Sequence, residues 1–232
     1  MTKLYKLTLA ISAIMIAFST IHAQQDDYKW EGFGGYAYMN LNRGLDKTAT
    51  GAEIPNYPSN RVNAHGFNGS LTYNFHRYVG ATFDFTAHTH GSDFTSPLQI
   101  SAPPAPPIPA ATIKESQSVY QYLFGIQVKD NKKDSQVLKP YFHFLGGFAH
   151  ETLTLDETTP TSAQLFHANS TDFAMKFGGG LDLRIHKNVD VRLIGFDWNP
   201  IYRSDLGAVG RITSVPAALQ NNYMFSFGVV FH

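Results

Sequence analysis

The chain has 232 residues, and its 18 Lys and Arg against 18 Asp and Glu give a formal charge of +0 at pH 7. Because basic residues are not in excess, the composition argues against a nucleic-acid-binding protein. Cysteine is absent, which excludes disulfides, thiolate metal sites and a lipidated cysteine anchor. Only 16% of the residues are charged, 14% are aromatic and 19 are glycine, a combination that favours β structure.

The beginning of the chain has the pattern of a secretory signal. Lys3 and Lys6 precede an apolar stretch at residues 7–18, and a short polar segment follows as far as Ala23. An uncleaved membrane anchor is the alternative, but this apolar run is shorter than the about 20 residues that a spanning helix needs. We therefore expect residues 1–23 to be a signal peptide and residues 24–232 to form one exported domain.

Eight later stretches show apolar and polar side chains in alternation. A period of two places one set of side chains on each face of a β-strand. The last stretch shows this most clearly, because its aromatic residues all fall on one face. The predicted strands span residues 28–41, 62–75, 78–90, 116–129, 139–151, 170–185, 189–198 and 221–231.

The connections favour a membrane barrel over a soluble one, although alternation alone fits both. Residues 76–77, 130–138 and 186–188 make short links after the second, fourth and sixth strands, whereas the other links are long and polar. Short turns at one end and long loops at the other are typical of an outer-membrane barrel. The expected lipid-facing aromatic residues are Trp30, Tyr36, Tyr38, Tyr73, Phe75 and Trp198.

Four stretches resemble the small OmpA-like outer-membrane β-barrel family. They are GFNGSLTYNFHRYVGATFDFTAH (residues 66–88), KPYFHFLGGFAHE (139–151), FGGGLDLRIHKNVDVRLIGFDW (177–198) and NNYMFSFGVVF (221–231). The resemblance implies an all-β, eight-stranded antiparallel up-and-down transmembrane barrel without a peptidoglycan-binding domain. It also implies insertion by the outer-membrane barrel assembly machinery, for which the last strand is the signal. In this chain that signal would comprise Tyr223, Phe225, Phe227, Val229 and Phe231.

If the apolar faces contact lipid, the opposite faces line the interior. The alternation places six charged side chains there, namely Glu31, Asp84, Lys176, Asp182, Arg184 and Arg192. Buried charges need partners, so we expect a network that plugs the lumen with help from Thr82, Gln121, Gln127 and His143. A narrow gated ion path is the alternative. Asp197 would join this network only if a bulge near Gly195 shifted the register.

Other candidate sites are weak. Neither a G-x-S-x-G nor an H-E-x-x-H motif occurs, so we expect no enzyme, no catalytic residue and no cofactor. His88 and His90, with Asp93 nearby, could bind a transition metal at the outer rim, but solvated rim residues are the favoured interpretation and we assign no metal site. The proline-rich residues 96–110 predict a stiff polyproline II segment, either a spacer or a ridge for a partner.

We therefore expect a monomeric outer-membrane protein with periplasmic termini, whose extracellular loops serve a surface or structural role. Its expected partners are outer-membrane lipid, the assembly machinery and an extracellular molecule bound by the loops. The alternatives are a porin-like, gated small-solute channel, a lipid-modifying enzyme and a soluble lipocalin-like barrel. The last would place Lys176, Asp182 and Arg184 outside and Phe173, Phe177 and Leu181 inside.

Overall fold

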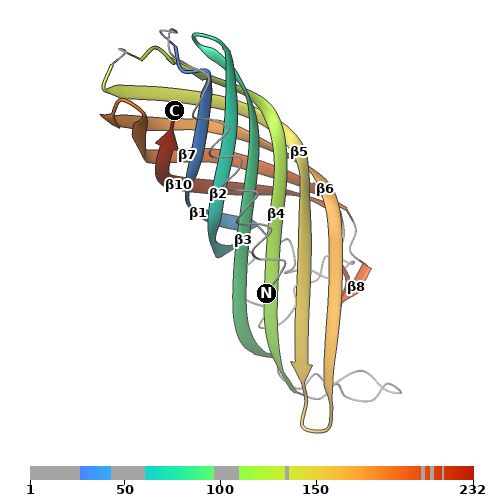
Figure 1. The fold of residues 1–232 in the computed structure, drawn as a ribbon. Helices are drawn as coiled ribbons and strands as arrows, with labels where there is room; N and C mark the ends of the chain where they lie inside the picture. Colours follow the sequence, from blue (N-terminus) through green and yellow to red (C-terminus); the bar gives the residue numbers. More distant parts are fainter. Residues whose placement is uncertain are drawn as a thin grey trace, which may run out of the picture.

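The computed structural model describes residues 27–42, 61–96, 110–133, 136–204, 207–209, 212–215 and 217–232. Their long strands close into one antiparallel barrel, in the order β1-β10-β7-β6-β5-β4-β3-β2 (Figure 1). The barrel strands are β1 (Trp30–Asn42), β2 (Arg61–His76), β3 (Val79–Ser96), β4 (Ala111–Lys129), β5 (Leu138–Thr158), β6 (Ala163–His186), β7 (Val189–Arg203) and β10 (Ala218–Phe231). The predicted eight-stranded up-and-down barrel is thus confirmed. No helix among the described residues is long and apolar enough to cross a membrane.

Strands β3–β7 are longer than predicted at the end that carries the long loops, and β7 continues to Arg203. β3 continues to Ser96, β4 begins at Ala111, β5 continues to Thr158 and β6 begins at Ala163. The register confirms that they remain paired, because Thr158 lies opposite both Thr112 and Ala163. Most outward residues of these additional segments are polar, with the exposed Leu165 as an exception, whereas inward residues such as Ile113 and Leu153 are apolar. The polar and apolar faces are therefore exchanged relative to the rest of each strand. We call the part of β3–β6 beyond the predicted strand ends the extension.

The connection from β7 to β10 contains a small hairpin that the sequence did not predict. β8 (Gly207–Val209) and β9 (Ile212–Val215) pair with each other in a separate antiparallel sheet. The predicted signal peptide, most of the first long loop and nearly all of the proline-rich segment lie outside the described residues.

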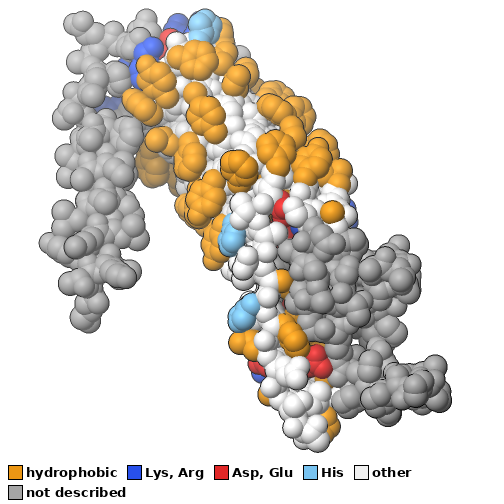
Figure 2. Space-filling model, turned by 90° about the vertical axis from the view of Figure 1, so that its right-hand side faces the viewer, with side chains coloured by type: hydrophobic (Ala, Val, Ile, Leu, Met, Phe, Trp, Pro, Cys, Tyr) orange, Lys and Arg blue, Asp and Glu red, His pale blue; other side chains and the backbone are white. Residues whose placement is uncertain are grey.

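Large apolar side chains form a belt on the outside of the barrel (Figure 2). On β4, Tyr122, Phe124, Ile126 and Val128 point outward and are 46–65% exposed, whereas the intervening Leu123 is 0% exposed. The belt occupies about nine to eleven residues of a tilted strand, which matches the hydrocarbon core of a bilayer. Farther along β4 the outward residues are Ser118, Ser116 and Lys114, so the extension stands outside the belt.

The orientation of the two faces overturns the lipocalin-like alternative. Lys176 and Asp182 are fully buried inside the barrel, whereas Phe173 and Phe177 are exposed on its outer surface. A soluble barrel would expose the charged residues and bury the aromatic residues. The prediction that the apolar faces of the strands point outward, toward lipid, is therefore correct for these residues.

A bulge interrupts β7 at Leu193 and Ile194. Gly228 pairs with Arg192 and Ser226 pairs with Gly195, so two residues of β7 face one residue of β10. Leu193 and Ile194 both point outward, at 48% and 51% exposure. The extra residue reverses the alternation, as bulges do, so that Asp197 and Asn199 point into the lumen whereas Phe196 and Trp198 remain on the outer surface.

Candidate functional site

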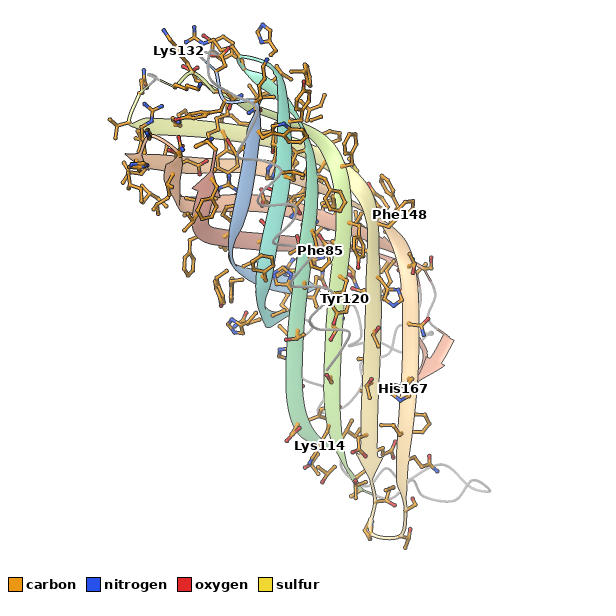
Figure 3. All side chains as sticks on the ribbon, viewed as in Figure 1. Phe85, Lys114, Tyr120, Lys132, Phe148 and His167 are labelled. Carbon is orange, nitrogen blue, oxygen red and sulfur yellow. The ribbon has the colours of Figure 1, made fainter. Side chains whose placement is uncertain are left out.

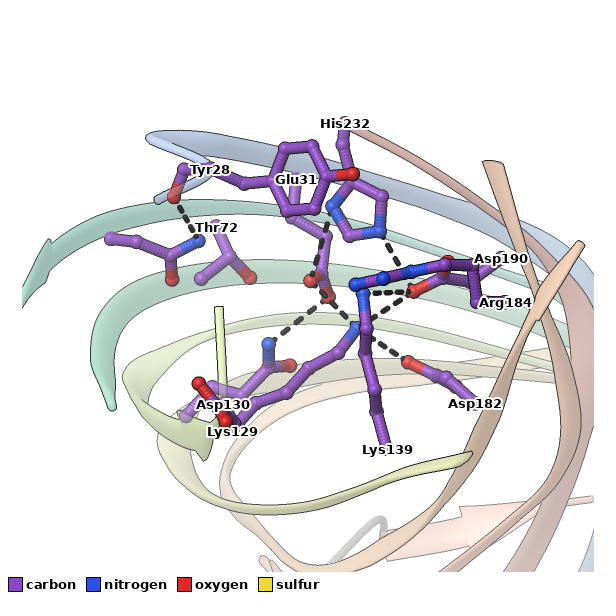
Figure 4. A network of polar contacts seen from close by, with 12 residues as sticks. Tyr28, Glu31, Thr72, Lys129, Asp130, Lys139, Asp182, Arg184, Asp190 and His232 are labelled. Carbon is purple, nitrogen blue, oxygen red and sulfur yellow. Dashed lines mark hydrogen bonds and ion pairs between the residues drawn. The ribbon is translucent and has the colours of Figure 1, made fainter. Parts of the chain in front are cut away.

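Seven ionisable side chains meet inside the barrel close to its short turns, and we call them the turn-end network. They are Glu31, Lys129, Lys139, Asp182, Asp190, Arg192 and His232. Lys129 lies at the centre, with its Nζ 2.8 Å from Glu31 Oε2 and 2.7 Å from Asp182 Oδ2 (Figure 4). None of the seven side chains is more than 3% exposed. Five strands are therefore joined through buried charges.

Acidic and basic groups balance within the turn-end network. Its three carboxylates face two lysines and one arginine, and His232 Nε2 lies 2.9 Å from Asp190 Oδ2. Arg192 Nε donates to Asp182 Oδ1 at 2.9 Å, and Lys139 Nζ donates to Asp190 Oδ2 at 3.0 Å. Removing either partner of such a pair would leave a buried charge uncompensated, which is costly in a medium of low dielectric constant. The balance allows six ionised groups to share this narrow interior.

Aromatic rings fill the space around the charges. The Arg192 guanidinium carbon lies 4.0 Å from the ring centroid of Phe33 and 3.9 Å from that of Tyr141. A guanidinium so close to two aromatic faces gains cation–π attraction. At the very end of the barrel, the Tyr28 ring stacks on His232 with centroids 4.0 Å apart. These contacts fill the turn end of the lumen with side chains.

A second buried charge pair lies farther from the turns. Lys176 Nζ lies 2.5 Å from Asp84 Oδ1 and donates to Thr86 Oγ1 at 2.9 Å. Asn68 Nδ2 donates to the other Asp84 oxygen at 2.7 Å, and Thr86 Oγ1 donates to Asp84 Oδ1 at 2.9 Å. Asp84 is thus held by three side chains from β2, β3 and β6. We call these four residues the Lys176 cluster.

Gly178 makes room for a third pair, His143 and Asp197. His143 lies opposite Gly178 on one side and Asp197 lies opposite it on the other, so β6 separates the two side chains. Their atoms Nε2 and Oδ1 are nevertheless 2.7 Å apart. A Cβ at Gly178 would collide with Asp197 Oδ1 and with the carbonyl oxygen of Phe196. The absent side chain of this glycine therefore permits a hydrogen bond across an intervening strand.

An apolar cluster also occupies the lumen, which the sequence analysis did not foresee. Its members are Ala37, Met39, Leu41, Val62, Ala64, Val119, Leu123, Leu145, Ala149, Ala174, Ile201 and Met224. Leu123 lies opposite Asp84 and Leu145 lies opposite Lys176, so the cluster begins at the level of the Lys176 cluster. Apolar side chains in the middle of a narrow channel exclude water and ions. The alternation identifies an inward face, but it does not indicate whether that face is polar along its whole length.

Polar groups reappear above the apolar cluster. With its amide oriented to satisfy both neighbours, Gln220 donates to Glu151 Oε1 at 2.9 Å and accepts from Arg203 at 3.1 Å. Within the apolar cluster, Gln121 lies between Val119 and Leu123 on β4 and donates to Asn199 Oδ1 at 2.6 Å, and Asn199 Nδ2 donates to the Met175 carbonyl oxygen at 2.7 Å. The lumen is therefore charged near the turns, mainly apolar in its middle and polar again toward the loops.

The six charged residues predicted for the lumen are divided between groups. Glu31, Asp182 and Arg192 belong to the turn-end network, while Asp84 and Lys176 form the separate Lys176 cluster. Arg184 is only half-buried, lies opposite Asp190 and donates to the Lys132 carbonyl oxygen at 3.2 Å. In the predicted insertion signal, four side chains are exposed on the outer surface and Val229 is half-buried. The exposed four are Tyr223, Phe225, Phe227 and Phe231.

Sequence reasoning missed four of the seven members of the turn-end network. Lys129 ends β4, Lys139 is the second residue of β5, Asp190 is the second residue of β7, and His232 follows the last strand. The alternation also predicts that the two lysines point inward, because Lys129 is two residues from the inward Gln127 and Lys139 is four residues from the inward His143. Asp197 is 1% exposed, and the bulge at residues 193–194 provides the register shift that its inward position requires.

The outer-rim histidines differ from their expected positions. His88 is 0% exposed inside the barrel, so its assignment as a solvated rim residue is wrong. It follows the inward period of Asp84 and Thr86 and lies well before the end of β3, which the prediction placed too early. His90 Nδ1 lies 3.0 Å from the Asn63 carbonyl oxygen. Among the described residues, no three His, Asp or Glu side chains are grouped as metal ligands.

Solved structures of outer-membrane and surface proteins are similar to this chain. Neisserial surface protein A (NspA) is 14% identical, with 89% of this chain and 99% of that chain covered and a TM-score of 0.45. The Yersinia pestis attachment invasion locus protein Ail, in complex with the heparin analogue sucrose octasulfate, is 16% identical over 88% of this chain and 100% of that chain, with a TM-score of 0.45. OprG from Pseudomonas aeruginosa is 14% identical over 90% of this chain and 98% of that chain, with a TM-score of 0.52. None of the curated protein sequences matches the chain.

The family comparison covers almost the whole chain. The model of the outer membrane protein beta-barrel domain matches residues 10–232. It agrees with the closed antiparallel barrel, the apolar outer belt and the charged interior described above. The match of the family model and the apolar outer belt place the protein in the bacterial outer membrane, and the chain belongs to the outer membrane protein β-barrel family.

Proposed function

We propose that this chain is a non-catalytic, non-conducting surface protein that binds extracellular partners through its extension and its loops. The observation that carries the proposal is the continuation of β3–β6 beyond the apolar belt. On β5, residues 152–158 add about 23 Å of strand at about 3.3 Å per residue. Lys114 and His167 lie on this part of the sheet, at the opposite end of the molecule from Lys132 (Figure 3). A protein with no role outside the membrane would not need so long a paired sheet there.

The extension is built as a stiff sheet with two different faces. Its outer face carries mainly hydroxyl, amide, imidazole and charged groups, with Thr154 Oγ1 3.1 Å from His167 Nδ1. Its inner face holds a second apolar cluster made of Ala111, Ile113, Leu153 and Leu155, against which Phe94, Phe166 and Ala168 pack. The paired strands and this cluster hold the outer face in a fixed shape, as recognition surfaces require.

The filled lumen supports the non-conducting part of the proposal. An eight-stranded barrel is only just wide enough for its own side chains, and here they form salt bridges and an apolar cluster across it. Conduction would require the pair of Lys129 with Glu31 and Asp182 to separate and the apolar cluster to hydrate. Both steps are unfavourable, so the gated channel is the second candidate.

Surface exposure of the extension can be tested by labelling, because the sequence contains no cysteine. We expect Thr154→Cys to react with a membrane-impermeant maleimide on intact cells. The matched control Lys187→Cys, in the exposed turn between β6 and β7, should react only after the outer membrane is permeabilised. Equal labelling of Lys187→Cys on intact cells, or none of Thr154→Cys, would contradict the proposed orientation.

The closed lumen can be tested by electrical recording. The purified barrel, verified by its heat-modifiable mobility on a gel, should give no discrete conductance steps in planar bilayers. Steps of uniform size that disappear when the protein is boiled would instead support the channel. Incubation with outer-membrane lipids should leave their masses unchanged, whereas a new lipid species would support an enzyme.

A further inference from the structure

The outer surface of β10, β1 and β2 changes from apolar to polar at the loop end of the belt. These three strands are adjacent in the barrel (Figure 1). At the boundary, Asn40 lies opposite Asn63 on one side and Tyr223 on the other, and Arg61 lies opposite the end of β1. Arg61, Asn63 and Tyr223 are exposed. Polar side chains from three strands therefore meet where the outer lipid headgroups of a membrane would lie.

Arg61 is positioned by residues of β1, the strand beside it, and of β10, the next strand in the barrel. Its NH1 donates to Asn40 Oδ1 at 2.7 Å, and its Cζ lies 5.4 Å from the centroid of the Tyr223 ring. Asn63 Oδ1 accepts from the Tyr38 hydroxyl at 2.7 Å and from Asn40 Nδ2 at 3.4 Å. These contacts hold the guanidinium against the barrel wall. Its position on the outer surface is thus built by side chains from β1 and β10.

The outward residues of β1, β2 and β10 include no carboxylate. β2 and β10 contain no Asp or Glu, and the single acidic residue of β1, Glu31, points into the lumen at 2% exposure. Arg61 therefore places a positive charge on a face where these three strands contribute no outward carboxylate. His65 places an imidazole ring at the same boundary, and its Nδ1 lies 2.5 Å from the Tyr36 hydroxyl oxygen. Such a face is complementary to an anion.

The neighbouring belt indicates which kind of anion would bind. Phe67, Phe225 and Phe227 are 42–57% exposed and lie directly on the membrane side of this boundary. An amphiphile with a phosphate headgroup could place its acyl chains on these rings and its phosphate at Arg61. A free phosphate ion would use only the polar half of the surface. The combination of both halves favours a lipid over a soluble anion.

We propose that Arg61, supported by Asn40, Tyr223 and the Tyr38–Asn63 pair, binds the phosphate group of an outer-leaflet lipid. A guanidinium presents several N–H donors in one plane, which matches the oxygens of a phosphate. The bound lipid would fix the depth and tilt of the barrel in the membrane. This inference depends on the outer-membrane location and does not depend on the proposed surface role.

Native mass spectrometry of the purified barrel in detergent micelles can test the site. The two probes are lipid A with its phosphates and the same lipid A after enzymatic dephosphorylation. The wild-type barrel should bind the phosphorylated form about tenfold more tightly, as expected for a charge-assisted hydrogen bond. Equal binding of the two forms by the wild-type protein would overturn the proposal without reference to any variant.

Substitutions assign the effect to Arg61. Arg61→Gln should lose most of the preference for the phosphorylated lipid, while Arg61→Lys should keep part of it because the charge remains. The control Lys187→Gln removes one positive charge at the opposite end of the barrel and should behave as wild type. Heat-modifiable mobility verifies that each variant is folded. An unchanged preference in Arg61→Gln would refute the site, and displacement of the lipid by millimolar inorganic phosphate would identify a soluble anion as the ligand.

Discussion

Replacement of Lys129 by Met is expected to destabilise the barrel strongly. The substitution keeps the length of the side chain but removes the ammonium group that lies 2.8 Å from Glu31 and 2.7 Å from Asp182. All three side chains are at most 1% exposed, so solvent cannot compensate the two carboxylates. Breaking a buried pair by removing one partner costs about 3–5 kcal/mol. Since Asp182 keeps Arg192 as a second partner, we expect a loss toward the lower end of that range.

The measurement is equilibrium unfolding in urea, followed in lipid vesicles or micelles by tryptophan fluorescence and by the heat-modifiable band. Lys187→Met is the matched control, because it removes a lysine from an exposed turn, and its free energy of unfolding should stay within about 0.5 kcal/mol of wild type. Glu31→Gln combined with Lys129→Met restores the charge balance and should recover part of the loss, with a coupling energy of about 0.5–3 kcal/mol. A loss below about 1 kcal/mol for Lys129→Met alone would refute the argument that the turn-end network depends on this charge.

Three further predictions address the barrel wall and one turn. Gly178→Ala should lower the free energy of unfolding by about 1–3 kcal/mol, because the new Cβ would collide with the backbone of β7. Gly32→Ala should leave it nearly unchanged, because nothing lies within 4 Å of the Cβ there, and urea unfolding measures both variants. Phe124→Arg, at a lipid-facing position that is 65% exposed, should cost about 2–4 kcal/mol in the same assay when refolded into lipid vesicles, and no loss there would contradict the belt. The hydrogen bond from Arg77 holds the pKa of Asp130 below its ordinary value, so its stabilising effect is present at neutral pH and is lost as acid protonates Asp130; carboxyl NMR titration should show the pKa rising in Arg77→Gln.

The sequence alone determined the fold and the orientation of its faces. Alternation in segments such as residues 221–231 identified strands, and the contrast between short turns and long loops distinguished a membrane barrel from a soluble one. The same alternation placed Glu31, Asp84, Lys176, Asp182 and Arg192 on the inner face. These are local properties, because successive side chains of one strand point to opposite faces.

The partners of the inner side chains were beyond the reach of that argument. Lys129 and Glu31 are 98 residues apart in the chain, and Lys129 and Asp182 are 53 apart. The sequence analysis treated Asp84 and Asp182 as parts of one network, whereas they belong to different layers of the lumen. The apolar cluster in the lumen was also not predicted. Nor was the Arg61 site on the outer surface, although Arg61 lies on the same face of β2 as His65 and Phe67.

Tertiary structure decided these features because partners in a barrel depend on the register of several strands at once. The bulge at Leu193 and Ile194 turned Asp197 inward, and the missing side chain of Gly178 then let it reach His143 across β6. Neither step can be derived from the alternation of a single strand. Within an uninterrupted stretch of strand, the alternation along the chain determined which way each side chain points. Bulges, strand register and closure of the barrel determined where that alternation changes and what each side chain meets.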